Sequence, residues 1–238
     1  MMFAAPNQSC VKPMSLQVGA SSLLPSSECR HLGVVIDAQL TLASHIRAVC
    51  KSARYHLWRI SRIRLYLDVE SAKCLVHSLV LSRLDYANSL FSGLTEKLLD
   101  SLQAVQNAAA RLIYGGDRRD SARPLLKRLH WLPIHERIAF KLSTIVYRSL
   151  GGTAPAYLVR RLKRHIPGRE GLRHCSVAAP TLDVPRSRKA RCGDRAFSVA
   201  AARTWNSLPE SVRTSPTLGE FKTKLKTHLY SLVFAVNS

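Results

Sequence analysis

Residues 42–62, with the sequence LASHIRAVCKSARYHLWRISR, decide the fold class. Their apolar residues recur at spacings of three and four, which is the period of one apolar face on an α-helix. These residues are Leu42, Ile46, Val49, Ala53, Leu57 and Ile60. Similar helical periods return along much of the chain, so we predict a mainly α fold built around a helical bundle.

The same stretch carries a row of cations roughly opposite its apolar face, which we call the basic ridge. An advance of about 100° per residue aligns Arg47, Lys51, Arg54, Trp58 and Arg62. Four cations with one aromatic ring among them suit a helix that follows a phosphate backbone, with Trp58 stacking on a base or sugar. The alternative is a solvated face on which Trp58 only packs at the rim.

The overall charge also predicts a polyanionic partner. The chain has 36 Lys and Arg against 15 Asp and Glu, which gives a formal charge of +21 and a pI near 10.5. A field of this size attracts nucleic acid without regard to sequence. An anionic membrane surface is the rival partner, but we expect no spanning helix, because His77, Arg83 and Asp85 interrupt the most apolar run.

Two further basic clusters follow in the second half of the chain. The first contains Arg160, Arg161, Lys163 and Arg164, and the second contains Arg186, Arg188, Lys189 and Arg191, with Arg195 close behind. We expect both clusters to contact phosphate. A short basic run is equally typical of a nuclear-import signal or a solubilising patch, so these alternatives stay open.

The pattern of turns and periods predicts five segments. Residues 1–14 form a loose lead-in, 15–37 a short β element, 38–166 the bundle, 167–193 a basic extended connection, and 194–238 two C-terminal helices. The predicted strands cover 16–18, 22–25 and 32–36. The predicted helices cover 42–60, Asp68 toward Phe91, Thr95 to Gly115, 133–150, 156–165, 194–206 and 218–233.

No residue pattern predicts a metal, cofactor or catalytic site. The six cysteines stand far apart without a Cys-x-x-Cys pair, so we expect free and mostly buried thiols. A zinc site from His165, His174, Cys175 and Cys192 is disfavoured, because its spacing matches no usual zinc finger. Asp85 lacks the second carboxylate that two-metal chemistry requires, and is expected to end or cap a helix. No export signal begins the chain, which favours the nucleus or cytoplasm.

Several strings resemble, in order, the end of the palm, the thumb and the segment after the thumb in jockey-like LINE reverse transcriptases. They are LGVVID (32–37), LT (40–41), HI (45–46), RLDY (83–86), LQAVQNAAAR (102–111), LHWLPI (129–134), RI (137–138), APAYL (154–158), RAFS (195–198), WNSLP (205–209) and FKTKLK (221–226). The resemblance covers about residues 16–234. It implies a thumb-like bundle from a non-LTR retrotransposon polymerase.

The same resemblance implies that this chain is not itself an enzyme. The family's palm aspartate and its Tyr-x-Asp-Asp strand do not occur in the sequence, and neither does its endonuclease. The implied role is a non-catalytic region that holds template RNA or an RNA–DNA hybrid through its phosphate backbone, without a cofactor. The alternative is a remnant helical interaction module with no polymerase role.

We expect the purified protein to extend no primer on any template with Mg²⁺ or Mn²⁺, because it offers no pair of palm carboxylates to hold the metal ions. A radiolabelled primer-extension assay measures this. Extension that survives the loss of Asp37 and Asp85 would contradict the prediction.

Overall fold

Helices stacked in tiers make up most of this computed structural model, which describes residues 15–117, 119–165, 181–187 and 193–235. The helices are α1 (Ala43–Ile63), α2 (Val69–Val76), α3 (Ser82–Asp85), α4 (Glu96–Tyr114), α5 (Arg123–Arg128), α6 (Ile134–Leu150), α7 (Ala156–Val159), α8 (Phe197–Asn206), α9 (Glu210–Arg213) and α10 (Leu218–Phe234). The prediction of a mainly α fold is confirmed.

Two short antiparallel hairpins precede the helices, as the predicted β element required. β1 (Leu16–Val18) pairs with β2 (Ser21–Leu23), and β3 (Glu28–His31) pairs with β4 (Val34–Asp37). β3 was not predicted, because its sequence ECRH is polar and largely exposed and has no apolar alternation. Leu32 and Gly33 turn the second hairpin with φ of 47° and 82°.

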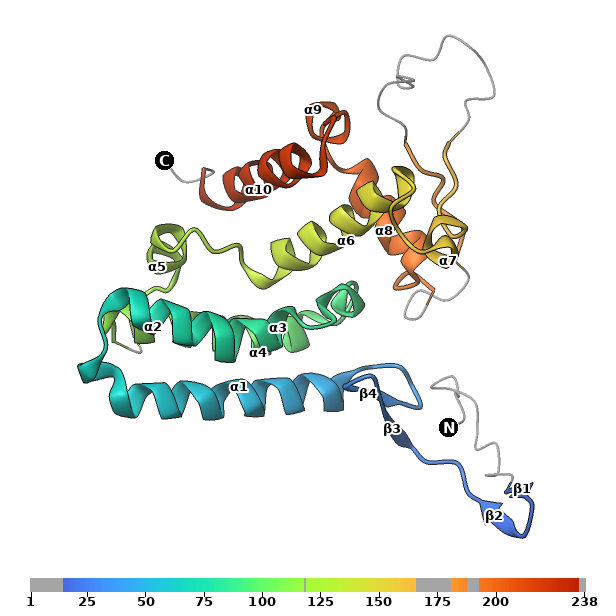
Figure 1. The fold of residues 1–238 in the computed structure, drawn as a ribbon, viewed down its shortest axis with the longest axis horizontal. Helices are drawn as coiled ribbons and strands as arrows, with labels where there is room; N and C mark the ends of the chain where they lie inside the picture. The colour runs from blue at the N-terminus through green and yellow to red at the C-terminus, as the bar shows by residue number, and fades with distance from the viewer. Residues whose placement is uncertain (1–14, 118, 166–180, 188–192, 236–238) are drawn as a thin grey trace.

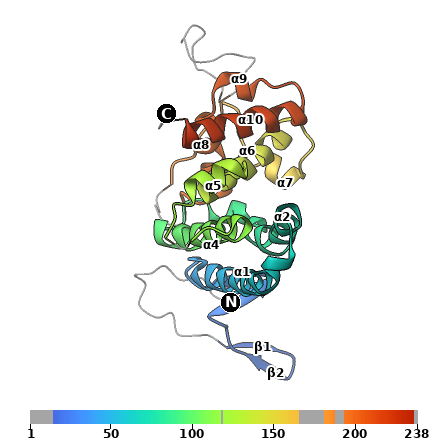
Figure 2. The ribbon, with the colours of Figure 1, turned by 90° about the vertical axis from the view of Figure 1, so that its left-hand side faces the viewer.

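The helical tiers enclose two main cores (Figures 1 and 2). α1 forms the outer tier, α2, α3 and α4 lie on it, α6 follows, and α8 and α10 cover the far side. Ile46, Ala53 and Leu102 belong to the core between α1, α4 and α6. Trp205 and Phe221 belong to the second core, between α6, α8 and α10. α6 therefore contributes to both cores.

The helix that begins after Asp68 contains a π-turn and ends earlier than predicted. The Asp68 carboxylate caps it by accepting a hydrogen bond from Ser71 N at 3.0 Å. The π-turn, η2 (His77–Leu81), joins α2 to α3, and Ser82 N–H bonds back to His77 O. α3 stops at Asp85, and Ala87 has a φ of 53°. The prediction of one helix toward Phe91 was therefore wrong, and a separate 3₁₀ turn, η3 (Asn88–Phe91), follows.

Other differences involve short helices and exposed thiols. The predicted helix over 156–165 is wrong beyond Val159, because a short turn follows and residues from Lys163 on pair with a distant segment, with Arg164 bridged to Leu182. The four-residue α9 and six-residue α5 were not predicted. Among the described cysteines Cys50 is buried, Cys29 is half-buried and Cys74 is exposed, so the expected burial is wrong for Cys74. The predicted connection lies mostly outside the described residues.

Side chains of α4 and α6 join the two tiers at the start of α6. Gln103 Oε1 accepts the Ile134 N–H at 2.9 Å, and Gln106 Nε2 donates to Leu132 O at 2.9 Å. Arg137 Nε donates to the same oxygen at 3.0 Å, and Arg137 Nη1 contacts the two Asp85 oxygens at 2.6 and 2.8 Å. Asp85 is thus a helix-end residue, as expected, and also an ion-pair partner across the tiers.

Replacing the buried Gln106 by Leu should lower the free energy of unfolding by about 1–3 kcal/mol, because the substitution removes hydrogen bonds inside the core. Urea denaturation at neutral pH measures the loss. Ala108→Gln, an exposed change on the same helix, is the control and should stay within about 0.5 kcal/mol. An equally small effect of Gln106→Leu would show that these bonds do not stabilise the joint between the tiers.

Candidate nucleic-acid interface

A tight turn around Asp37 fixes the start of α1 and therefore the direction of the basic ridge. The Asp37 carboxylate accepts hydrogen bonds from Gln39 N at 3.1 Å, from Thr41 N at 2.9 Å and Oγ1 at 3.0 Å, and from Leu42 N at 2.7 Å. Burial raises the pKa of Asp37, but these bonds outweigh burial and hold it below the ordinary 3.8. The turn also carries Leu40 and Leu42 in left-handed conformations.

The whole basic ridge lies on the exposed face of α1. Arg47, Lys51, Arg54 and Arg62 are exposed, and Trp58 is 58% exposed. None of the ion pairs found within the described residues involves these four cations. Arg47 makes only long contacts of 3.4 Å, to Ala43 O and Ser44 Oγ. The cations therefore remain available for an external anion.

Tyr55 extends the aromatic part of the ridge, and the sequence analysis missed it. Its ring stacks on Trp58, with centroids 6.3 Å apart and planes 30° apart, and it is 54% exposed. The Arg59 guanidinium lies 5.9 Å from the Tyr55 ring centroid. The spacing of three residues between the two rings could have indicated the pair, since such residues are neighbours on a helix.

A groove of about 380 Å³ runs beside this aromatic pair, between α1 and the helix that contains η2. Trp58, Arg59 and Arg62 line it together with His56. Burial and the nearby Arg83 and Arg59 guanidinium groups lower the pKa of His56 below its usual 6.5. His56 is therefore neutral at pH 7, and the arginines supply the positive charge of the groove.

The described members of the other two basic clusters do not lie on α1. Arg160, Arg161, Lys163 and Arg164 are exposed on the segment after α7, and the Arg164–Leu182 bridge pairs that segment with residues 181–187, which include the exposed Arg186. Arg188, Lys189 and Arg191 lie outside the described residues. Arg195 has an internal role, because it packs on Gly93 and donates to Leu40 O and Leu90 O.

The described residues contain no group of three or more His, Cys, Asp or Glu side chains that could hold a metal ion. His165, one member of the zinc site considered from the sequence, contacts Asp183 through Nδ1 at 2.6 Å. His174, Cys175 and Cys192 lie outside the described residues. No helix in the described part of the chain is long and apolar enough to cross a membrane.

Comparisons of the chain with family models, curated proteins and solved structures give no match. The properties of the candidate interface therefore come from its own geometry. It combines unpaired cations, two stacked exposed rings and a cationic groove along one helix.

Replacing Asp37 by Asn should loosen the start of α1 and lower the free energy of unfolding at pH 7 by about 1–2 kcal/mol, the scale of a helix-capping interaction. The pKa of Asp37 is lower in the folded protein, so its contribution is fully present above pH 3.8 and is lost as the pH falls further. Urea denaturation of both proteins at pH 7 and pH 3 measures the difference, which should narrow at pH 3. A constant difference would mean that the Asp37 charge has no part in it.

Proposed function

We propose that this chain is a non-catalytic nucleic-acid-binding region of a non-LTR retrotransposon reverse transcriptase, and that it holds RNA or an RNA–DNA hybrid by the phosphate backbone. The proposal rests mainly on the basic ridge, whose cations are exposed and have no carboxylate partner among the described residues. The assignment to a non-LTR retrotransposon reverse transcriptase comes from the resemblance of the sequence strings described above. Binding of this kind would hold a duplex in position without performing chemistry.

The length of the ridge suits a phosphate backbone. Arg47 and Arg62 are 15 residues apart, which corresponds to about 22 Å along a helix. One strand of a B-form duplex carries a phosphate about every 3.4 Å of axis, and the A-form geometry of RNA and of hybrids spaces phosphates more closely, so at least about six phosphates span the same length. Four cations can therefore each meet a phosphate of one strand, in a contact that does not read the base sequence.

The stacked rings of Tyr55 and Trp58 add a second kind of contact. Bases and sugars stack on exposed aromatic side chains whatever their identity, because every base has a π-face. Both rings are more than half exposed, and cations flank them on the same helix. A single-stranded segment that leaves the duplex would find both a charged track and a stacking surface here.

A protein-interaction module is the second candidate function, and the turn after α1 favours it. Leu65 and Tyr66 are 95% and 87% exposed. Large apolar side chains at such exposure, grouped at a turn, are typical of contact surfaces for another protein. This candidate predicts that the ridge cations are dispensable for partner binding, whereas Leu65 and Tyr66 are required.

Replacing Arg47, Lys51, Arg54 and Arg62 by Gln should weaken binding to all RNA and hybrid sequences alike, while the apolar face of α1 keeps the fold. The slope of log affinity against log salt concentration should become shallower by roughly three to four units, or somewhat less for a single strand. Fluorescence anisotropy titrations at several salt concentrations measure the slope, and circular dichroism checks the fold.

The matched control removes four exposed cations from other surfaces, by Gln substitutions at Lys97, Arg119, Lys127 and Lys222. This control should change the slope by about one unit or less, because it alters only the general field. An unchanged slope in the ridge variant with a normal fold would remove α1 from the interface. Stronger binding to anionic liposomes than to RNA in co-sedimentation would favour a membrane surface as the partner.

Replacing Trp58 by Ala should cost about 1–3 kcal/mol of binding free energy to single-stranded RNA with little change in the salt slope, because stacking releases few counterions. Tyr55→Ala should act in the same direction. The same titrations measure both variants. If affinity is unchanged in both, the two rings only pack at the rim of the ridge.

A further inference from the structure

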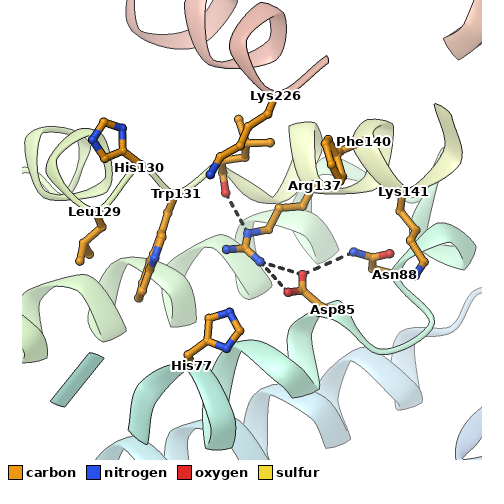
Figure 3. Close-up of a pocket in the computed structure, with 11 residues that line it drawn as sticks. His77, Asp85, Asn88, Leu129, His130, Trp131, Arg137, Phe140, Lys141 and Lys226 are labelled. Carbon is orange, nitrogen blue, oxygen red and sulfur yellow. Dashed lines mark hydrogen bonds and ion pairs between the residues drawn. The ribbon is translucent and has the colours of Figure 1, made fainter. Parts of the chain in front are cut away.

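A second cavity lies between the tier of η2 and α3 and the tier of α6 and α10. It measures about 530 Å³, and its lining comes from η2, α3, η3, the segment before α6, α6 itself and α10. Figure 3 shows Trp131 on one side and Arg137 on the other, with His77 below and Lys226 above. His77 and Lys226 are far in the sequence from Trp131 and Arg137, and they meet only because the tiers stack.

The lining carries an excess of positive charge. Three of its side chains, Arg137, Lys141 and Lys226, are full cations, and Asp85 is its carboxylate. Asp85 pairs with Arg137 at 2.6 Å, which neutralises that pair. Lys141 and Lys226 are exposed and take part in none of the ion pairs within the described residues. The cavity therefore offers two uncompensated ammonium groups to an anion.

Flat rings give the cavity a second character. Trp131 and Phe140 are half-buried in its wall, and His130 lies beside Trp131. Asn88 also lines the cavity, and its Nδ2 is directed at Asp85 Oδ1, 3.5 Å away. Its Oδ1 is itself buried and is not open to the cavity. The rings therefore favour a ligand with a flat face.

We propose that this cavity binds a single nucleotide unit, with its base against Trp131 and its phosphate at Lys226 and Lys141. An inorganic anion would leave the rings unused, and an apolar ligand would leave the lysines unused. The volume lies within the usual range for small-ligand sites. An aromatic face beside cations is the usual platform for a base.

This site is separate from the basic ridge, and the inference does not need the proposed function to hold. The ridge would contact many phosphates of a long strand, whereas the cavity has room for one unstacked or terminal nucleotide. A free mononucleotide therefore probes the cavity alone. The ridge variant with four Gln substitutions should bind it as well as the unmodified protein does.

The test is an isothermal titration of the full chain with AMP, adenosine and ribose 5-phosphate. AMP should bind with a Kd between about 10 μM and 1 mM, the range for a ligand of this size with a few good contacts. Adenosine and ribose 5-phosphate should each bind at least about tenfold more weakly, because each lacks one of the two contacts. Equal binding of AMP and ribose 5-phosphate would reduce the site to an anion site and overturn the proposal.

Variants on different walls separate a specific site from the general charge. Lys226→Gln and Lys141→Gln should each weaken AMP binding by about tenfold, the loss of one charge-assisted hydrogen bond. Lys222→Gln, one turn away on the same helix and outside the lining of the cavity, should not weaken it. Trp131→Leu should weaken binding, and Trp131→Phe, which keeps a ring, should restore most of it; thermal unfolding checks both folds. No saturable AMP binding, or equal binding by Lys226→Gln and Lys222→Gln, would overturn the proposal. AMP binding without RNA binding would support the nucleotide site in the cavity and refute the proposed function.

Discussion

The double burial of α6 is the constraint on which the rest of the structure depends. Ile134, Ile138 and Leu142 enter the core shared with α1 and α4, whereas Val146 enters the core shared with α8 and α10. A helix that packs into two cores along its length needs its polar ends held by neighbours, and Gln103 and Gln106 of α4 do this at its first turn. With α6 fixed in the middle, α1 and α10 become the outer layers, and each keeps one face free.

The sequence predicted the features that repeat regularly along one helix. The apolar face and the basic ridge of α1 both follow from a period of 3.6 residues, and the structure has the helix at Ala43–Ile63. It did not predict α5 or α9, because helices of four to six residues contain too few turns to show a period. The cavity could not be predicted from the sequence for a different reason. His77, Trp131 and Lys226 share no local pattern, and only the order of the tiers brings them together.

The two cationic surfaces differ in how they balance their charge. The ridge has no carboxylate partner among the described residues, so its attraction acts on any nearby phosphate and is screened by salt. The cavity holds an internal carboxylate against Arg137, and its remaining lysines stand beside rings and an amide. Such a surface gains less from charge alone and more from the shape and hydrogen bonds of its ligand. The surface whose attraction depends mainly on charge therefore lies on α1, whereas the surface that depends more on the shape of a ligand lies between the inner tiers.

The π-turn at His77–Leu81 sets which residues of the following helix face α6. Val76 and Leu81 are five residues apart and both fully buried; a π-turn brings residues at this spacing toward one face, whereas an α-helix sets them about 140° apart. An α-helix through the same stretch would rotate everything after it by about 100°, and would turn Leu84 out of the core and Asp85 away from Arg137. The stretch therefore behaves as an α-helix that has accepted a one-residue insertion. In chains of common descent that lack the insertion, the gap belongs inside residues 77–81, and an alignment that moves it elsewhere would pair Asp85 with the wrong position.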